Sequence, residues 1–532
     1  MAGITVGKTG QRISCQEGAN LLEVLLEEGI FVDNPCNGKG ICGKCKVKVT
    51  GGEASPMSRT EEIHLKPEEV DQGIRLSCMV QILGDLEVEI LKQEGTHTIL
   101  DQGYLPEFQR DQGREGYGVA VDIGTTTVVA ALIDLETGEE AAGASMINAQ
   151  KQYGLDVLTR ITYEYEHPET GARELQKAIV GSLNAMIAQM CREADISPEI
   201  IREIDVSANC TMMHMLLGVD ARSIGRAPYQ PAFLEAKTLL AGEIGLKAGE
   251  HTRLYCLPQV SAYIGADIVA GAHVCQLARA QGNVLFIDIG TNGEIVLASR
   301  GRLLCCSCAA GPALEGMNIS SGMRADEGAI EDVTFTEDGI QLTTIGDQEP
   351  AGICGSGILA VLRELLGAGL VKKTGVFVKP EQIPQESALR GRLRTNGKKR
   401  EFILCEEPEL LVTQSDIRQV QLAKGAILSG FTALLGKAGL EMEELDQVMI
   451  AGQFGAHLPA DSLVGTGILP KEVKEKLVYV GNSSKTGAYM TLLSQAAKQD
   501  VEELACRMEY MELAETENYE RIFAECMIFP EI

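Results

Sequence analysis

Four cysteines near the amino terminus have a spacing suited to an iron–sulfur cluster. The pattern C-x5-C-x2-C-x32-C is formed by Cys36, Cys42, Cys45 and Cys78. A two-iron cluster needs four thiolates that approach from two directions, and a glycine-rich loop with three of them plus one distant cysteine provides this. The spacing therefore predicts a [2Fe–2S] cluster. It leaves open a zinc site, although zinc sites usually pair two short Cys/His hairpins.

Two later segments each place an aspartate and a Gly-Thr turn between apolar strands. The first contains Asp122, Gly124, Thr125, Thr126 and Thr127. The second contains Asp288, Gly290, Thr291, Asn292 and Gly293. Such a turn can present N–H groups and a hydroxyl to phosphate oxygens, and the aspartate can hold Mg²⁺ through water. One copy is typical of ordinary hairpins, but two copies favour a clamp for one triphosphate.

A third turn, punctuated by glycine, follows an apolar strand expected at residues 447–451. It consists of Gly452, Gln453, Phe454 and Gly455. Because the two glycines carry no side chain, a flat base can lie against the backbone there. The three segments together predict a nucleotide site.

These segments resemble the phosphate-1, phosphate-2 and adenosine motifs of the acetate and sugar kinase, Hsc70 and actin superfamily. The resemblance implies two RNase H-like lobes that close on ATP. It also implies that Asp122 and Asp288 are catalytic, orienting Mg²⁺ and the attacking water, while the threonines and Asn292 hold phosphates. The motifs alone fit a kinase as well as an ATPase.

The surrounding elements indicate an α+β multidomain protein. Residues 1–92 read as a β-grasp, ferredoxin-like domain with the five-residue cysteine spacing of its adrenodoxin-like branch. A polar, turn-rich linker that could act as a hinge is expected at 93–115. The first ATPase lobe, or middle domain, is expected at 116–282 and the second lobe at 283–532.

Composition limits the classes of partner. A formal net charge of −28 over 532 residues argues against nucleic acid, which needs clustered Lys and Arg, and there is no Trp for stacking on bases. Apolar runs are too short for a membrane span, and the first residues lack a signal peptide, so a cytoplasmic location without membrane contact is expected. The 16 cysteines then read as reduced thiols and cluster ligands.

The whole chain resembles the reductive activators of corrinoid proteins of anaerobic methyltransferase systems. The segments that carry this resemblance are 207–214, 308–325 and 352–357. It implies ATP-dependent transfer of a low-potential electron from the cluster to a Co(II) corrinoid protein, restoring Co(I). An external low-potential electron donor and a possible homodimer are implied too. Some relatives carry two C-terminal four-iron clusters, which Cys506 and Cys526 alone cannot supply.

Two other functions remain open from the sequence. One is a kinase or ATPase of the same superfamily with a regulatory redox cluster. The other is an electron-transfer activator of a radical or dehydratase enzyme. Dehydratase activators share the ATPase motifs, but they bridge a four-iron cluster between subunits and lack an amino-terminal four-cysteine domain.

Several further segments have ordinary structural interpretations. Residues 481–486 faintly resemble a P-loop but lack its spacing, so a turn and a helix N-terminus are expected. The cysteines at 305–308 and His214 are expected in the core. The basic stretch within 370–414 is expected to be a solvated loop, with a docking surface for an acidic partner as the alternative. Residues 415–439 predict a long helix, and no motif is assigned to 501–532.

Overall fold

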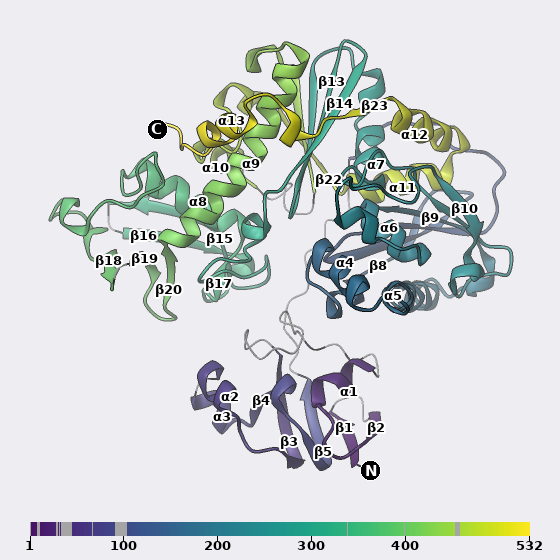
Figure 1. Ribbon diagram of the computed structural model, residues 1–532, viewed down its shortest axis with the longest axis horizontal. Coiled ribbons are helices and arrows are strands. Elements are labelled where there is room, and N and C mark those ends of the chain that lie inside the picture. The colour runs from purple at the N-terminus through teal and green to yellow at the C-terminus, as the bar shows by residue number, and fades with distance from the viewer. Residues whose placement is uncertain are drawn as a thin grey trace.

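The structure is a computed structural model that describes most of the chain (Figure 1). The described residues are 2–7, 11–27, 30, 32, 45–65, 67–90, 104–337, 339–397, 399–452 and 458–531. Outside them lie two of the predicted cluster ligands, Cys36 and Cys42, and three residues of the predicted adenosine turn, Gln453, Phe454 and Gly455.

The amino-terminal domain is a β-grasp sheet. Its strands follow the order β2 (Gln11–Cys15), β1 (Ala2–Val6), β5 (Ile82–Ile90), β3 (Lys46–Ala54) and β4 (Ile74–Leu76). Strand β1 pairs antiparallel with β2 and parallel with β5. Three helices accompany the sheet: α1 (Leu21–Glu27), α2 (Arg59–His64) and α3 (Pro67–Asp71). Alternating apolar side chains of the strands, such as Ile4, Val47 and Val88, form the buried core with Leu21.

The first lobe is built on a six-stranded mixed sheet. Its order is β10 (Lys237–Leu240), β11 (Arg253–Cys256), β9 (Ile201–Ala208), β6 (Tyr117–Ile123), β7 (Thr127–Asp134) and β8 (Glu140–Ile147). The central strand β6 is parallel to β9 and antiparallel to β7. Its helices are α4 (Val157–Glu166), α5 (Gly171–Glu193) and α6 (Cys210–Leu217).

The second lobe repeats this arrangement. Its sheet runs β22 (Leu477–Gly481), β21 (Gln447–Ala451), β12 (Val284–Ile289), β13 (Gly293–Ser299), β14 (Arg302–Cys308) and β23 (Met508–Tyr510). The order β14-β13-β12-β21-β22 matches β8-β7-β6-β9-β11, and β12 is again antiparallel to one neighbour and parallel to the other. Two lobes of the same topology, each starting with an Asp-Ile-Gly-Thr hairpin, confirm the expected RNase H-like pair.

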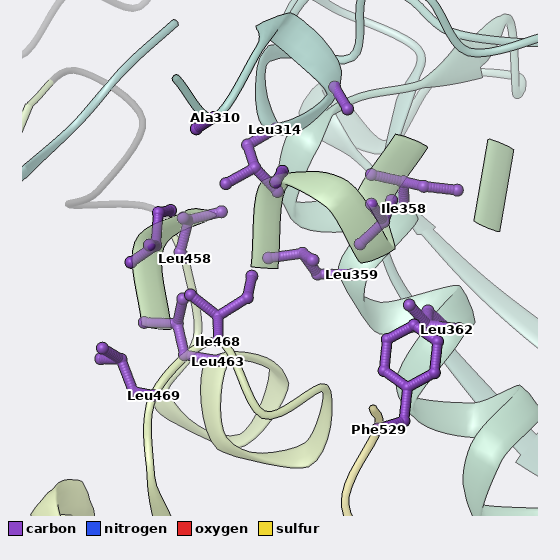
Figure 2. Packing of buried hydrophobic residues seen from close by; sticks show 14 of the residues in the cluster. Ala310, Leu314, Ile358, Leu359, Leu362, Leu458, Leu463, Ile468, Leu469 and Phe529 are labelled. Atoms are coloured by element: carbon purple, nitrogen blue, oxygen red, sulfur yellow. The ribbon is translucent and has the colours of Figure 1, made fainter. Parts of the chain in front are cut away.

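The rest of the second lobe surrounds a large apolar core. Its helices are α8 (Gly355–Gly367), α9 (Gln414–Ala438), α10 (Ala460–Gly465), α12 (Gln495–Arg507) and α13 (Tyr519–Cys526). Helix α9 confirms the long helix expected at 415–439. Figure 2 shows Leu359 of α8 in this core among Leu314, Leu463 and Phe529. Among the described helices, none has both the length and the apolar character needed to cross a membrane.

The expectation of a solvated loop within 370–414 is wrong. A small sheet lies within this stretch, formed by β18 (Leu393–Asn396), β19 (Lys399–Cys405) and β20 (Leu410–Thr413). A second small sheet precedes it in the chain, formed by β15 (Ala329–Thr336), β16 (Gly339–Thr344) and β17 (Gly352–Ile353). Phe377 and Phe402 are fully buried in the core of the lobe. The charges at 390–400 hid the run of three buried apolar residues in β19, Phe402, Ile403 and Leu404, which anchors the segment in the core.

Two helices join the lobes by crossing between them (Figure 1). Helix α7 (Ala266–Val274) follows the first lobe's strands, yet its Ile268 packs with Phe286 of the second lobe. Helix α11 (Ser483–Leu493) follows the second lobe's strands, yet its Ala488 packs with Ala120 of the first. A Cβ atom placed on Gly487 of α11 would lie 2.5 Å from the Cβ atom of Ala270. The two helices therefore touch backbone to backbone at the joint.

Replacing Gly487 with alanine should weaken this joint. The added methyl group has to push α7 and α11 apart, so the free energy of unfolding should fall by about 1–3 kcal/mol in thermal or urea unfolding. Gly181→Ala is the matched control, because a methyl group added to the exposed Gly181 of α5 would have no neighbour within 4 Å. That variant should gain about 0.5–1 kcal/mol from helix propensity alone. Equal shifts in the two variants would contradict the close crossing.

Candidate functional site

Two of the four predicted cluster ligands lie side by side in the amino-terminal domain. The Sγ atoms of Cys45 and Cys78 are 3.2 Å apart, and both residues are buried. The hydrogen bond with Cys78 lowers the pKa of the Cys45 thiol to about 6, against the effect of burial. Two converging sulfurs, one of them readily ionised, fit the thiolate ligation that an iron–sulfur cluster requires.

The short helical turn that carries Cys78 is fixed by the element opposite. Asn20 donates from Nδ2 to the Cys78 carbonyl oxygen at 2.9 Å, and the same side chain accepts from the N–H of Leu22 at the start of α1. Cys78 lies in the turn Ser77–Met79 that follows β4, while Cys45 directly precedes β3, which pairs with β4. The pairing of two strands therefore brings together cysteines that are far apart in the sequence.

The first phosphate-type turn is held in shape by three side chains from other segments. Within the turn, the Gly124 N–H donates to the Thr127 carbonyl oxygen at 2.9 Å. Asn148 donates to the Gly124 carbonyl oxygen at 2.9 Å, and Asn209 donates to Thr125 Oγ1 at 3.0 Å. Arg160 donates to the Thr125 carbonyl oxygen at 2.5 Å. Sequence patterns gave no sign of these supports, because they come from three distant elements.

Arg160 is a fully buried cation beneath that turn. Burial lowers the pKa of its guanidinium to about 9. It also donates to the Gly154 carbonyl oxygen at 2.9 Å and to Gln150 Oε1 at 3.3 Å. A positive charge placed under a Gly-Thr turn makes the site above it favourable for an anion.

Asp122 stands at the end of β6 and is held by the start of α11. Ser484 Oγ donates to Asp122 Oδ1 at 2.7 Å, and Asn482 Nδ2 donates to Oδ2 at 3.0 Å. Ser484 Oγ also lies 2.9 Å from Ser207 Oγ, on the strand paired with β6. Asn482 is the N-cap of α11, which confirms the turn and helix N-terminus expected at 481–486. Asn482 and Ser484 therefore bind the aspartate of the first lobe, although they follow β22, a strand of the second lobe's sheet.

The second phosphate-type turn lies against the predicted adenosine strand. Asp288 pairs with Ala451 across β12 and β21. Gly452 has a φ of +94°, and a Cβ atom there would lie 2.6 Å from Asp288 Oδ1, so a side chain at this position would strike the carboxylate. The Gly290 N–H donates to the Asn292 carbonyl oxygen at 2.9 Å, and Gly293 starts β13. Thr291 Oγ1 donates to the buried Glu315.

Four carboxyl groups between the lobes lie close enough together for the charge of one to affect the pKa of another. Burial, followed by the charge of Asp122, raises the pKa of Asp288 to about 7. Burial, with the charges of Asp288 and Asp122, raises that of Asp267 to about 8. Burial also raises the pKa of Asp122, while Ser484 and Asn482 oppose that rise, and the pKa of Glu294 is raised too. Such an accumulation of negative charge favours a bound cation.

Asp267 and Glu294 were missed by the sequence analysis. Asp267 lies in the first turn of α7, and its neighbour Gly265 approaches the Asn209 backbone, where a Cβ atom would be 2.5 Å from Cα. The pattern Gly-Ala-Asp at the start of an apolar helix could have indicated Asp267. Within the described part of the chain, no three acidic, His or Cys side chains are close enough together to hold a metal ion by themselves. A cation here would therefore need water or phosphate oxygens as further ligands.

The residues expected in the core are there. Cys305, Cys306 and Cys308 are buried in β14, and burial raises the pKa of Cys305 and Cys306. His214 is fully buried and stacks on Phe233, with ring centroids 4.3 Å apart. Its Nδ1 donates to the Cys210 carbonyl oxygen at 2.8 Å, and its Nε2 accepts from the Ala232 N–H at 3.1 Å. Both ring nitrogens are satisfied by backbone, so this histidine is structural.

Three known protein families together match most of the chain. Residues 4–83 match the family of the 2Fe-2S iron-sulfur cluster binding domain. Residues 117–280 match the family described as the RACo middle region. Residues 282–532 match the family described as the C-terminal domain of RACo, the ASKHA domain.

Individual relatives agree with these matches. The corrinoid activation enzyme RamQ of Eubacterium limosum is 33% identical over 411 residues, which is 76% of this chain and 69% of that protein. A [Co(II) methylated amine-specific corrinoid protein] reductase of Methanosarcina barkeri is 26% identical over 440 residues, 76% of each chain. A solved structure of a reductive activator for corrinoid, iron-sulfur protein covers 100% of this chain and 98% of its own, at 30% identity and a TM-score of 0.69. The chain therefore belongs to the family of reductive activators of corrinoid proteins.

Proposed function

We propose that this protein uses ATP to drive the transfer of one electron from its own [2Fe–2S] cluster to the Co(II) corrinoid of a methyl-carrier protein, restoring Co(I). The observation that carries the proposal is that one chain joins a thiolate site, at Cys45 and Cys78, to a two-lobed site with paired phosphate-type turns. An external low-potential donor would refill the cluster. The names of the relatives support a corrinoid protein as the acceptor.

The residues of the two turns and the carboxyl groups between the lobes suit ATP with Mg²⁺. The N–H groups and hydroxyls of the two turns, at 124–127 and 290–293, would bind phosphate oxygens. Mg²⁺ would neutralise charge on the phosphates. Asp122 and Asp288 would orient its water ligands, and Asp267 lies close enough to both to be affected by their charge. Gly452, with residues 453–455, would receive the base. We assign the cluster domain to 1–92, the linker to 93–115 and the two lobes to 116–282 and 283–532.

Ser484→Ala tests the support of Asp122. Loss of the hydroxyl donor should raise the pKa of Asp122, because the Ser484 hydrogen bond lowers it. Since a hydrogen bond to a charged group contributes about 1.5–3 kcal/mol, ATP hydrolysis at neutral pH should fall about 10- to 100-fold, and the acidic limb of its pH profile should move to higher pH.

Ser483→Ala is the matched control for this variant. Ser483 is the next residue along the chain and is also buried, but its Oγ has no hydrogen-bond partner among the described residues. Its replacement should leave the pH profile of hydrolysis where it is. A shift of the same size in both variants would contradict the proposed role of Ser484.

The function itself is tested by visible spectroscopy under anaerobic conditions. The reconstituted protein, a reductant and a Co(II) corrinoid protein encoded near its gene are mixed with MgATP or with MgADP. Formation of the Co(I) absorption band only with MgATP supports the proposal. Conversion at the same rate without ATP would contradict the ATP requirement, and no conversion with any neighbouring corrinoid protein would overturn the function. Transfer of phosphate from ATP to a small metabolite would favour the kinase alternative.

A further inference from the structure

The end of the expected linker is bound to the ATPase. Residues 104–115, here called the strap, run along α11. The Tyr104 N–H donates to the Val480 carbonyl oxygen at 2.9 Å, just before α11 begins, and the Asp111 N–H donates to that of Leu493 at 2.9 Å, where α11 ends. Between them, Phe108 meets the ring of Tyr489 edge-on, at 6.0 Å between centroids. The strap thus follows the full length of the helix.

The strap provides hydrogen-bond partners for the backbone groups at the end of α11 and at the start of α12. The last carbonyl groups of a helix have no partner within it. At the end of α11, Leu493 accepts from the Asp111 N–H and Leu492 accepts from the Arg114 guanidinium. The first N–H of α12, from Gln495, donates to Asp111 Oδ2 at 2.9 Å. The cation lies at a helix C-terminus and the anion at a helix N-terminus, which are the favourable positions for each.

Arg114 also ties the strap to the first lobe's sheet. Its guanidinium lies 2.6 Å from Glu203 Oε2 on β9. Glu203 in turn pairs with Lys498 of α12 at 2.7 Å, and Lys498 lies 3.2 Å from Asp205. On the same strand, Ser207 lies beside Asp122 in the register of β9 and β6. Arg114 therefore fixes the end of α11 to the strand that supports the nucleotide site.

The opposite end of α11 binds Asp122 through Asn482 and Ser484. We propose that Asp111 and Arg114 are positioning residues, which hold the eleven-residue α11 at its C-terminal end. By fixing that helix they determine how Asn482 and Ser484 contact Asp122. They thereby couple the nucleotide site to the chain that leads to the cluster domain. Because coupling is reciprocal, a nucleotide that shifts α11 changes the docking of the strap, and a loosened strap changes the site. This inference depends on the proposed function in one respect, namely that the nucleotide is ATP.

Hydrogen exchange on the full-length protein tests the proposal. Without nucleotide, Arg114→Ala should speed exchange of residues 482–486 about fivefold or more, because the far end of α11 is released. The Lys485 N–H, which donates to Asn482 Oδ1 at 2.9 Å, is the most informative amide. Asp111→Asn keeps the hydrogen bond from the residue 111 N–H to Leu493 but removes the charge of the side chain. It should also speed the exchange of residues 482–486.

Arg110→Ala is the control, because Arg110 is in the same strap but donates to the Thr137 carbonyl oxygen of the first lobe and not to α11. It should leave exchange at 482–486 unchanged. Unchanged exchange there in Arg114→Ala, or an equal change in Arg110→Ala, would overturn the proposal. Added MgATP should alter exchange of residues 104–115 in the wild type and not in Arg114→Ala. If MgATP does not bind, the proposed function fails, while the nucleotide-free comparison still decides this inference.

Discussion

Asp288→Asn is expected to abolish ATP hydrolysis and, at the same time, to stabilise the nucleotide-free protein. Asp288 lies at the end of β12, and its carboxylate is brought close to those of Asp122 and Asp267. If it orients Mg²⁺ and water, its neutral isostere should cost about 10²- to 10³-fold or more in kcat. The iron–sulfur cluster, in another domain, should be unaffected.

The gain in stability follows from the raised pKa of this carboxyl group. A carboxyl group whose pKa is higher in the folded state than in the unfolded state favours folding while it is protonated, and loses that contribution as the pH rises through its folded pKa. Because the folded pKa is about 7 for Asp288 and about 8 for Asp267, the wild-type protein without nucleotide should lose stability as the pH rises from about 4, the usual carboxyl value, through these two values. Asp288→Asn removes one of the repelling charges, so its melting temperature should fall less than that of the wild type between roughly pH 4 and roughly pH 8.

Asp416→Asn is the control for Asp288→Asn, because it shows what happens to stability when a buried aspartate held by backbone N–H groups loses its charge. Asp416 is also buried, but it accepts from the N–H groups of Thr413 at 2.8 Å and Ser320 at 2.9 Å at the start of α9. Its replacement should lower stability by about 1–2 kcal/mol and leave hydrolysis intact, because it caps a helix. If Asp288→Asn lowered the melting temperature, the proposed repulsion among the carboxylates would be wrong. If this variant hydrolysed ATP at the wild-type rate, the proposed catalytic role of Asp288 would be wrong.

The turns could be predicted from sequence because their chemistry is local. Each Asp-Ile-Gly-Thr segment lies between two apolar strands, and the repeat of that pattern indicates a repeat of the lobe. The strands and helix around Cys45 and Cys78 were equally visible as alternation of apolar and polar residues. Short-range patterns of this kind do not depend on the rest of the fold.

The supports of the site were not predictable because they depend on the fold. Arg160 reaches the carbonyl group of Thr125 from α4, and Ser484 reaches Asp122 from a helix that belongs to the other lobe's chain segment. Neither position has a motif in its own neighbourhood. The same reason explains the strap. Its polar, turn-rich composition is that of a linker, and only the fold places Arg114 beside the end of α11 and beside Glu203 of β9.

Cys78→Ala is expected to remove the cluster completely while ATP hydrolysis continues. A two-iron cluster requires four thiolates, and Cys78 is the ligand that the second strand region supplies. Its Sγ lies 3.2 Å from that of Cys45, so its loss also removes the hydrogen bond that lowers the pKa of Cys45. The electron paramagnetic resonance signal of the reduced cluster should be absent from reconstituted protein, and Co(I) formation should fall to the background rate.

Cys15→Ala is the matched control in the same domain. Cys15 is buried in the same core, but burial raises the pKa of its thiol, and its Sγ donates to the Ala2 carbonyl oxygen at 3.6 Å. A thiol that stays protonated is a poor ligand, so this variant should keep the full cluster signal. Loss of the signal in both variants would indicate that the domain had unfolded, and stoichiometric zinc in the wild type would overturn the cluster. Continued hydrolysis in Cys78→Ala would show that the nucleotide site works without an electron to deliver.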